Sequence, residues 1–419
     1  MALAILGGNP VRTKEFTAWP MFNSDEESAL IKVLHSGKWG GYGIEVQEFE
    51  DGLRSMHAIR HVVACSNGTV ALEVALRSVG VSCGDEVIVS PFTFIASASA
   101  ILLCQGVPVF VDIDSETLNL TPATVEAAIT CRTKAIVAVH FGGHPAEMDA
   151  ITAIAAKHGL AIVEDCSHAL GARWKGMPVG NFGNVATFSF QQFKLVTAGE
   201  GGAVATNDSA IADSVWGYCN QGRRRGAAWY EHYSLGSNYR LTALQASVLS
   251  AQLKRVAEQT AIRTRNAEYL RRQLKGFTGI RTGSVSEFVD QHPQYLMTLR
   301  YDPSAFSGVS REVFLSAIEA EGIPLRPVYP YPLYRNPLFR KEALAKDGGS
   351  GWESIPDYHD LYLEKSEQVC SDGLWLEHQL FLGAESDMDD IMSAFQKVQD
   401  DRHFLEKHQE ELIAGQAAR

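Results

Sequence analysis

The residue with the clearest chemical potential in this chain is Lys194, in the segment SFQQFKLVTAGEGGAV. It follows the apolar run VATFSF and precedes a glycine-rich stretch that holds Gly199, Gly201 and Gly202. An apolar setting favours the neutral amine of a lysine, which attacks carbonyl carbon atoms. Glycines let the backbone turn sharply or pass close to a ligand. A lone lysine is more often an ordinary surface residue, so its interpretation depends on its companions.

Asp165 closes another apolar run, at the start of the segment EDCSHALGA. A carboxylate at this position could pair with the protonated pyridine nitrogen of a cofactor, and that ion pair makes the ring an electron sink. It could equally cap the segment that follows. By itself the position favours neither role.

The segment Ser66–Thr69 places Gly68 between an apolar run and a helical pattern. The free N–H groups at the start of a helix bind phosphate, and a glycine lets the backbone approach closely. For this motif alone, an ordinary N-cap by Ser66 or Thr69 is the commoner explanation. Taken together, the lysine, the acid and this phosphate cradle predict one cofactor site.

The elements that must position these residues are short apolar, β-branched runs between Arg60 and Thr206. They are HVVACS, EVIVS, VPVFVDI, KAIVAV, LAIVED, VATFSF and GAVAT. Helical patterns lie between most of them, at Thr69–Val79, Ala96–Leu103, Pro122–Ile129 and Met148–His158. Continuous apolar strands alternating with helices predict an α/β fold with a largely parallel sheet buried on both faces. Ligands of such sheets bind at the carboxyl ends of the strands.

The pattern changes after Thr206. Residues 241–274 are expected to form a long helix, broken near Val256, and a smaller α+β segment follows from about Ile280 to Val398. The tail after Asp400 has the pattern of a charged helix without a clear core face. A chain of 419 residues exceeds the usual size of one core, so we expect two domains, at residues 1–255 and 256–419.

Charge and hydropathy exclude several classes of protein. The net charge of -12 repels phosphate backbones, so a nucleic-acid partner is not expected, although Arg223–Arg225 could meet an anion locally. The N-terminal segment lacks a basic region and a long apolar stretch, and no run of about 18 apolar residues occurs. We therefore expect a cytoplasmic protein without a membrane partner.

Motifs for nucleotides and metals are also missing. The chain contains neither G-x-G-x-x-G nor G-x-x-x-x-G-K-[ST], and its seven cysteines form no CxxC pair. His140 and His144 have the i, i+4 spacing of a helical zinc site, but the intervening FGG is not helix-like. No metal is expected, and His140 is a candidate for the wall of a substrate pocket instead.

Across nearly its whole length the chain resembles the DegT/StrS family of pyridoxal-phosphate-dependent sugar aminotransferases. The segments that carry the resemblance, in order, are GGNPVR, SNGTVAL, PFTFIASASA, EDCSHALGA, SFQQFKLVTAGEGGAV, GSNYRLTALQA and WLEHQLFLG. The resemblance implies a fold type I aminotransferase: a seven-stranded, mostly parallel sheet with helices on both faces and a smaller α+β C-terminal domain. It also implies a homodimer with shared active sites and pyridoxal 5'-phosphate as cofactor.

The resemblance further implies a role for each matching residue. Lys194 would bond to the cofactor as the catalytic residue, Asp165 would pair with its pyridine nitrogen, and His168 would lie near its phenolic oxygen. The remaining cofactor contacts would be Phe94 on the ring face, Gly68, Thr69 and Ser189 at the phosphate, and Asn238 reaching the phosphate in the partner subunit. Candidate substrate contacts are His140, Tyr329 and His378.

The motif wording is most similar to the inosose aminotransferase and aminohydroxybenzoate synthase branch of the family. Tyr329 stands where many nucleotide-sugar members carry a histidine, and Phe193 replaces a small or polar residue. The prediction is therefore transfer of an amino group from glutamine or glutamate to a cyclic keto sugar or keto-cyclitol. The alternatives are a nucleotide-linked keto-sugar aminotransferase, an aminohydroxybenzoate synthase-like lyase and a non-catalytic, cofactor-binding regulator. Members that dehydrate their substrates replace the lysine with histidine, so retention of Lys194 disfavours that reaction.

Overall fold

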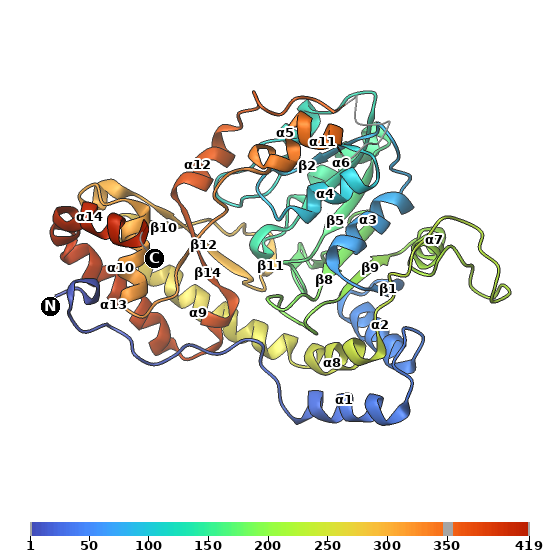
Figure 1. Ribbon diagram of the computed structural model, residues 1–419, viewed down its shortest axis with the longest axis horizontal. Helices are drawn as coiled ribbons and strands as arrows, with labels where there is room; N and C mark the ends of the chain where they lie inside the picture. The colour runs from blue at the N-terminus through green and yellow to red at the C-terminus, as the bar shows by residue number, and fades with distance from the viewer. Residues whose placement is uncertain (1, 347–354, 418–419) are drawn as a thin grey trace.

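A seven-stranded sheet forms the centre of the larger of two lobes (Figure 1). The computed structural model describes residues 2–346 and 355–417. In their order across the sheet the strands are β1 (His61–Cys65), β9 (Gly202–Thr206), β8 (Val185–Ser189), β5 (Ala161–Asp165), β4 (Thr133–Val139), β2 (Glu86–Val89) and β3 (Val107–Phe110). Neighbouring strands are parallel, except that β9 is antiparallel to both β1 and β8. The predicted α/β class and mostly parallel sheet are confirmed. Each of the seven strands lies in one of the apolar runs, except that β4 begins one residue before its run, at Thr133.

Helices cover both faces of this sheet, as expected. On one face lie α3 (Gly68–Ser78), α4 (Ala96–Leu103) and α7 (Ser209–Cys219). On the other face lie α2 (Ile44–His57), α5 (Pro122–Ala127), α6 (Met148–His158) and α8 (Ala243–Leu253). Successive strand residues point to opposite faces, so Val87 belongs to the first core and Ile88 to the second. Because both faces are buried, the strands are continuous apolar runs rather than alternating ones.

The four predicted helices between the strands begin and end within two residues of their expected limits. The cap of α3 was predicted wrongly, because neither Ser66 nor Thr69 provides it. The side chain of Asn67 does so instead, accepting a hydrogen bond from the amide of Val70 at 2.9 Å. Asn67 has an extended backbone, which is the conformation that lets a side-chain oxygen turn back to the third amide of the helix.

The smaller lobe is built on a four-stranded antiparallel sheet. Its strands, in spatial order, are β10 (Ile280–Thr282), β12 (Leu296–Tyr301), β14 (Gly373–Glu377) and β13 (Arg326–Pro327). Around it lie the helices α9 (Val256–Leu274), α10 (Arg311–Ala320), α13 (Glu385–Asp400) and α14 (Arg402–Ala417). The predicted break in the long helix is the junction of α8 and α9. The tail helix α14 does have a core face, because Leu405 is fully buried.

The two hydrophobic cores do not follow the predicted division at residue 255. Leu3 and Phe16, near the N-terminus, pack into the core of the small lobe. Conversely, Tyr334 and Tyr358 pack against the sheet of the large lobe. The helix α9 begins at Val256, and the division at residue 255 stays a prediction, because each lobe also contains a segment that lies far away in the sequence.

The remaining elements connect or border the lobes. They are α1 (Ser24–Ser36), α11 (Lys341–Lys346), α12 (Glu364–Asp372), a small sheet of β11 (Val289–Gln291), β6 (Arg173–Trp174) and β7 (Met177–Pro178), and the 3-10 turns Ala4–Leu6, Phe141–Gly143, Pro303–Phe306, Leu333–Arg335, Pro337–Phe339 and His378–Leu382. Of the helices described, none is both long and apolar enough to cross a membrane.

Candidate active site

A cavity of about 750 Å³ lies where β1, β4, β5 and β8 end, and the small lobe closes its other side. Its wall contains Gly68, Thr69, Phe94, Asp165, His168, Ser189, Lys194 and Tyr329, all of which were predicted as site residues. The described residues of the wall do not include His140, His378 or Asn238. The structure therefore brings the lysine, the acid and the phosphate cradle together, as the sequence predicts.

The start of α3 and the end of β8 form one end of this cavity. The first two helical amides, of Gly68 and Thr69, have no hydrogen-bond partner among the described residues, since the Asn67 cap serves the amides that follow. The hydroxyls of Thr69 and Ser189 also lack partners within the described chain. A Cβ on Gly68 would lie 2.6 Å from the Cβ of Ser189, so only glycine permits this approach. Unused donors at a helix start form an anion site.

Asp165 is buried at the end of β5, and its carboxylate is held by two neighbours. The hydroxyl of Ser97, in the first turn of α4, donates to Oδ2 at 2.9 Å, and the amide of Ser167 donates to Oδ1 at 3.1 Å. A carboxylate fixed in this way can pair with a cation that enters the cavity. Ser97 was missed in the sequence, although it lies within the family segment PFTFIASASA.

The turn that carries Lys194 is fastened by residues from distant parts of the chain. The indole N–H of Trp19 donates to the carbonyl of Gln192 at 3.0 Å. The ring of His378 donates to the carbonyl of Phe193 at 3.1 Å. The backbone immediately before the lysine is thereby held by the N-terminal segment and by the small lobe.

Tyr295, immediately before β12, contacts the amine of Lys194. The sequence did not indicate this contact. The Lys194 Nζ donates to the Tyr295 hydroxyl at 3.3 Å and lies 4.7 Å from the ring centroid. Tyr295 also lines the cavity. No motif or spacing distinguishes this tyrosine in the sequence, because its position depends on how the small lobe docks.

His168 lies on the cavity wall with its ring stacked on that of Tyr295, the centroids 4.3 Å apart. Its Nδ1 accepts a hydrogen bond from the amide of Gly142 at 3.4 Å, so Nε2 carries the proton and can donate to a ligand oxygen. Burial, and then the nearby charge of Lys194, lower the pKa of His168 well below its ordinary value. The ring is therefore neutral at physiological pH.

Phe94 and Tyr329 offer aromatic surface to the cavity. The Phe94 side chain is 57% exposed although it borders the cavity, which leaves its ring available to stack on a bound ring. Tyr329 packs edge-on against Phe92 and Trp375, at 5.4 and 5.3 Å between centroids. The described residues provide no hydrogen-bond partner for the Tyr329 hydroxyl.

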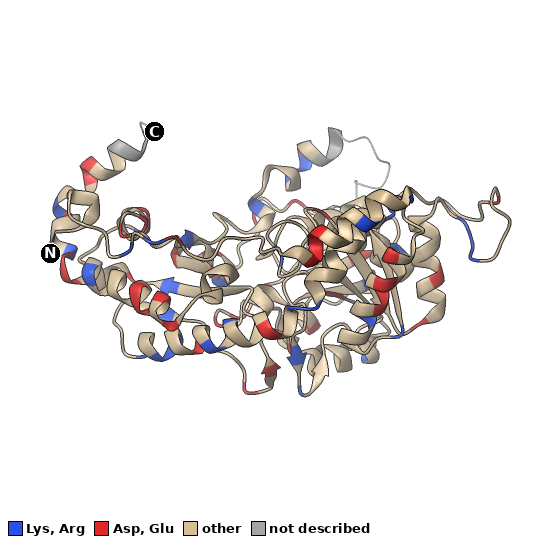
Figure 2. Ribbon diagram, turned by 90° about the horizontal axis from the view of Figure 1, so that it is seen from below, with Lys and Arg blue, Asp and Glu red and all other residues tan. Residues whose placement is uncertain are grey.

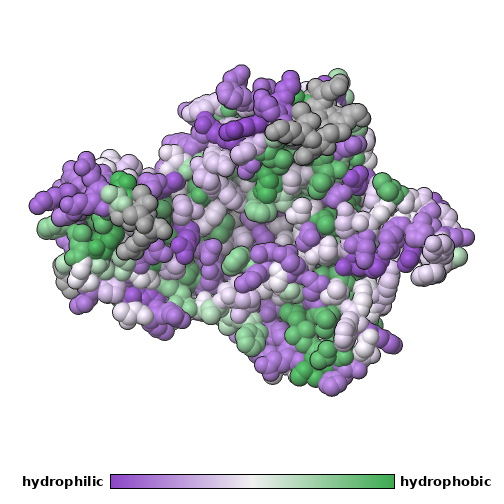
Figure 3. All heavy atoms as spheres, viewed as in Figure 1, coloured by the Kyte–Doolittle hydropathy of each residue, from purple (hydrophilic) through white to green (hydrophobic). Residues whose placement is uncertain are grey.

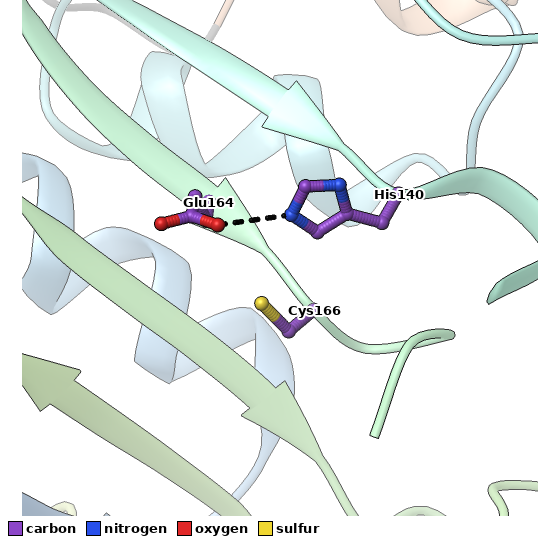
Figure 4. Close-up of side chains that lie close together, drawn as sticks. All are labelled: His140, Glu164 and Cys166. Carbon is purple, nitrogen blue, oxygen red and sulfur yellow. Dashed lines mark hydrogen bonds and ion pairs between the residues drawn. The ribbon is translucent and has the colours of Figure 1, made fainter. Parts of the chain in front are cut away.

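His140 does not contact the cavity, which corrects its predicted role as a substrate contact. The ring is fully buried, with Nε2 donating to Glu164 at 3.1 Å and Nδ1 accepting from the amide of Ala146 at 3.1 Å (Figure 4). Both ring nitrogens are thus occupied. The His140 amide donates to the carbonyl of Asp165, so this histidine fixes the end of β5 instead.

His140, Glu164 and Cys166 lie close enough together to hold a metal ion in principle (Figure 4). The Glu164 carboxylate, however, already accepts hydrogen bonds from the amides of Gly180, Phe182 and Gly183 as well as from His140. The histidine nitrogen that faces it carries a proton, and burial raises the pKa of the Cys166 thiol well above its usual value. This cluster is therefore a closed hydrogen-bond network between β4, β5 and the loop before β8.

His378 and Asn238 also lie away from the wall of the cavity. His378 is buried behind Tyr295, with the two rings stacked 5.7 Å apart, so it supports the wall from outside and does not reach a substrate. Asn238 is exposed on the loop after α7, where it pairs with Asn220 in an isolated β-bridge. Its predicted role concerns a partner subunit and stays a prediction.

The chain belongs to the DegT/DnrJ/EryC1/StrS aminotransferase family, whose model matches residues 20–396. It is 38% identical over 413 residues to the L-glutamine:2-deoxy-scyllo-inosose aminotransferase of Streptoalloteichus tenebrarius, which covers 94% of this chain and 97% of that protein. Its structure is similar to the crystal structure of 3-amino-5-hydroxybenzoic acid synthase, with a TM-score of 0.82, 35% identity and coverage of 93% and 99%. It is also similar to NtdA from Bacillus subtilis with bound cofactor PMP, with a TM-score of 0.75, 25% identity and coverage of 93% and 86%.

The fold is thus that of the fold type I aminotransferases, and the protein is a pyridoxal-phosphate-dependent aminotransferase. The cavity fits that cofactor. It offers unused amides and hydroxyls for a phosphate, a buried carboxylate at Asp165 for a pyridinium, and the amine of Lys194 for an aldehyde carbon. The three groups lie around one cavity. Together they support a pyridoxal-phosphate site more strongly than any one of the three motifs does alone.

Proposed function

We propose that the protein transfers an amino group from glutamine or glutamate to a free cyclic ketone of the inosose type, as a step in aminocyclitol formation. The observation that carries the proposal is the charge of the cavity wall. The wall contains four acids, namely Glu73, Asp165, Glu200 and Glu377, and within the described chain Lys194 is its only lysine or arginine. A nucleoside diphosphate would bring further negative charge beside these carboxylates, whereas a neutral polyol would not.

The same wall suits a polyhydroxylated ring. Glu200, Glu377 and Tyr329 present acceptors and a hydroxyl to the cavity, apart from the groups that fit the cofactor. A site that bonds hydroxyl groups discriminates strongly against analogues that lack them. The similar Streptoalloteichus enzyme is named for a glutamine donor and a deoxy-inosose acceptor, which supports this choice of substrates.

In this proposal each wall residue has a definite task. The bound cofactor supplies an electron sink that stabilises negative charge on the substrate carbon. Asp165 keeps the pyridine nitrogen protonated, while Gly68, Thr69 and Ser189 hold the phosphate. Lys194, once free of the cofactor, would accept a proton at Nζ from the donor's α-carbon and deliver it to the cofactor in the same half-reaction; the second half-reaction would run these transfers in reverse. Such positioned proton transfer contributes about 10²–10⁴-fold to the rate.

The decisive experiment compares acceptors. The enzyme is first aminated with glutamine, freed of donor, and then mixed with a scyllo-inosose or with a nucleotide-linked 4-keto sugar while the return of the aldehyde form is followed spectroscopically. We expect a higher kcat/KM for the inosose. A double variant, Glu200→Gln with Glu377→Gln, should reduce the difference in kcat/KM between the two acceptors, because it removes the two carboxylates that repel the diphosphate. A clear preference of the wild type for the nucleotide sugar would refute the proposal.

A second candidate is an aminohydroxybenzoate-forming reaction, because the structure of such a synthase covers 93% of this chain with a TM-score of 0.82. That reaction creates an aromatic ring. Ultraviolet absorbance of the product therefore separates the candidates, since an aminocyclitol has no aromatic band. An aromatic product from a cyclic amino-ketone precursor would favour the second candidate.

A homodimer with shared sites also belongs to the proposal, and the surface supports it. An apolar patch covers α1 at the bottom of the view in Figure 3, where Leu30, Ile31 and Leu34 are exposed. The loop after α7 projects from the body (Figure 1) and exposes Trp229 and Leu235. Apolar patches of this kind on soluble proteins mark interaction sites, and a second copy would also bring Asn238 toward a neighbouring cavity.

Subunit mixing tests this arrangement. Lys194→Ala and Asn238→Ala homodimers are each expected to be impaired, and exchange of their subunits should create one site with both residues intact. We expect activity to return toward a quarter of the wild-type value at equal mixing, since random exchange makes half the dimers heterodimers and each has one of two sites repaired. Mixed dimers without any recovered activity would contradict the shared site.

A cytoplasmic location and the absence of a nucleic-acid or membrane partner remain parts of the prediction. Acidic and basic residues are interspersed over the ribbon in Figure 2, with one basic segment on the loop after α7, formed by Arg223–Arg225.

A further inference from the structure

Tyr295 is the side chain nearest to the lysine amine in the hydrogen-bond network. The phenolic oxygen accepts the N–H of Lys194 at 3.3 Å, and the face of the ring lies 4.7 Å from the same nitrogen. The tyrosine comes from the small lobe, whereas the lysine comes from the turn between β8 and β9. The contact therefore spans the two lobes at the point where the proposed proton transfer takes place.

Two histidines stack on the Tyr295 ring. The His168 centroid lies 4.3 Å away with an interplanar angle of 27°, and the His378 centroid lies 5.7 Å away with an angle of 19°. Burial keeps both imidazoles uncharged by lowering the pKa of His168 strongly and that of His378 to about 3. A tilt of the Tyr295 ring would disturb both of these stacked contacts.

His378 acts on both partners of the Tyr295–Lys194 contact. Besides stacking on the tyrosine, its ring donates to the carbonyl of Phe193, the residue before the lysine. Trp19 in turn packs edge-on against His378 with centroids 4.5 Å apart. The Tyr295 ring and the backbone just before the lysine are consequently held by the same buried side chain.

We propose that Tyr295 is a catalytic residue that orients the Lys194 amine, with His378 as the positioning residue behind it; the proposal rests on the proposed role of Lys194. A neutral amine has two N–H bonds and one lone pair. Donation of one N–H to the phenolic oxygen directs the lone pair away from the ring and into the cavity. When the donor's C–H bond breaks, the lone pair takes the proton and the amine becomes an ammonium. The hydrogen bond from the amine to the Tyr295 hydroxyl is kept throughout.

Tyr295→Phe is the principal test, because it keeps the stacked ring and removes only the hydroxyl. We expect kcat to fall about 10- to 100-fold, as for loss of a hydrogen bond to a charged group, with KM changed less than about twofold. The kinetic isotope effect with α-deuterated glutamine should rise, since proton transfer becomes slower than the other steps. Tyr269→Phe, which removes an exposed hydroxyl from α9, is the matched control and should leave both values unchanged.

A second measurement uses the cofactor-free protein. Acylation of Lys194 by acetic anhydride, followed by peptide mass spectrometry across a pH series, reports the amine directly. Tyr295→Phe should change this acylation profile, because the amine loses the phenolic oxygen that accepts one of its N–H bonds. His378→Ala should lower kcat by a smaller factor and raise the isotope effect in the same direction.

The outcomes separate this proposal from the proposed function. Wild-type kcat, isotope effect and acylation profile in Tyr295→Phe would overturn the role of Tyr295 while leaving Lys194 in place. Transamination by Lys194→Ala at the wild-type rate would instead overturn the proposed role of Lys194, and a preference for the nucleotide sugar would overturn the proposed substrate without touching Tyr295. A lower kcat in Tyr295→Phe with an unchanged isotope effect and acylation profile would also refute the proposal, since it would indicate a merely structural role.

Discussion

The cavity has two walls of different origin. The wall on the large lobe consists of residues at strand ends and helix starts, such as Gly68, Asp165, Ser189 and Lys194. The wall on the small lobe consists of Tyr295, before β12, together with Tyr329 and Glu377 near β13 and β14. The first wall carries the groups that fit the cofactor, and the second carries groups that fit an acceptor or hold the lysine.

This difference indicates that the two walls have different functions. Parallel strands end at a common edge, so the large-lobe wall can present the same cofactor groups whatever the substrate is. The small lobe reaches the cavity through an antiparallel sheet with short strands, whose side chains can vary without disturbing that edge. Substitutions on the first wall are therefore expected to reduce the chemistry itself. Substitutions of Tyr329 and Glu377 on the second wall should alter substrate preference by smaller factors, whereas Tyr295 contacts the lysine and is the exception on that wall.

The largest expected effect is that of Lys194→Ala. Loss of the amine removes both the covalent contact with the cofactor and the proton carrier, so kcat should fall by about 10⁴-fold, the upper end for positioned proton transfer. The visible-edge absorbance band of the bound cofactor should change with it. An unchanged band and rate would show that another lysine serves the cofactor.

Asp165→Asn should have the next largest effect. The amide keeps the size of the side chain but cannot hold a proton on the pyridine nitrogen, so kcat should fall about 10²–10³-fold, as for loss of one preorganised electrostatic partner. Single-turnover rates with saturating glutamine measure this directly. Ser97→Ala, which removes one hydrogen bond to the same carboxylate, provides a graded comparison and should cost less.

Tyr329→Phe probes the wall on the small lobe and should have a smaller effect. Removing one hydroxyl that meets a neutral substrate costs about 1 kcal/mol, or about fivefold in kcat/KM for the acceptor. The first half-reaction with glutamine should keep its rate, because this hydroxyl has no role there. A loss as large as that of Asp165→Asn would contradict the division between the two walls.

The smallest effect concerns stability at acid pH. His378 has a pKa of about 3 in the folded protein and an ordinary value near 6.5 when unfolded, because burial, and next the charge of Arg263, disfavour its protonation. Between these values the unfolded chain binds the extra proton, so stability is complete above about pH 6.5 and is lost as pH falls toward 3. The slope is at most about 1.4 kcal/mol per pH unit for one proton.

His378→Gln should remove this one-proton contribution from the acid limb. His57 and His144, whose pKa values burial lowers to about 4, leave part of the slope in place. Denaturant unfolding at a series of pH values between 3 and 7 measures the change. An acid limb with the wild-type slope would show that His378 is not kept neutral in the folded protein.

Much of the fold and of the large-lobe wall could be predicted before the structure. The seven strands were apparent because burial on both faces makes each a continuous apolar run. Asp165 and Lys194 stood out because each follows such a run, and Gly68 because it precedes a helix. The role of His168 came from the resemblance to a family and not from spacing, and its neutral state required the structure.

The predictions that failed concern residues whose surroundings come from elsewhere in the chain. His140 directly follows β4, next to the end of β5 where Asp165 lies, yet its ring bonds Glu164 instead of entering the cavity. His378 lies near the cavity but behind Tyr295, so proximity in the motif did not predict contact. The domain limits stay a prediction, although Leu3 packs in the small lobe and Tyr358 in the large lobe, on the other side of residue 255 in each case.

The sequence by itself determined the sheet, the helices around it and the cofactor end of the cavity, because each of these depends on strand–turn–helix units of a few neighbouring residues. Only the tertiary structure decided that Tyr295 meets the lysine amine, that His378 supports it, and that Trp19 holds the turn nearby. These contacts join segments more than a hundred positions apart. They arise from the docking of the small lobe and the N-terminal segment, and no local backbone preference encodes such an arrangement.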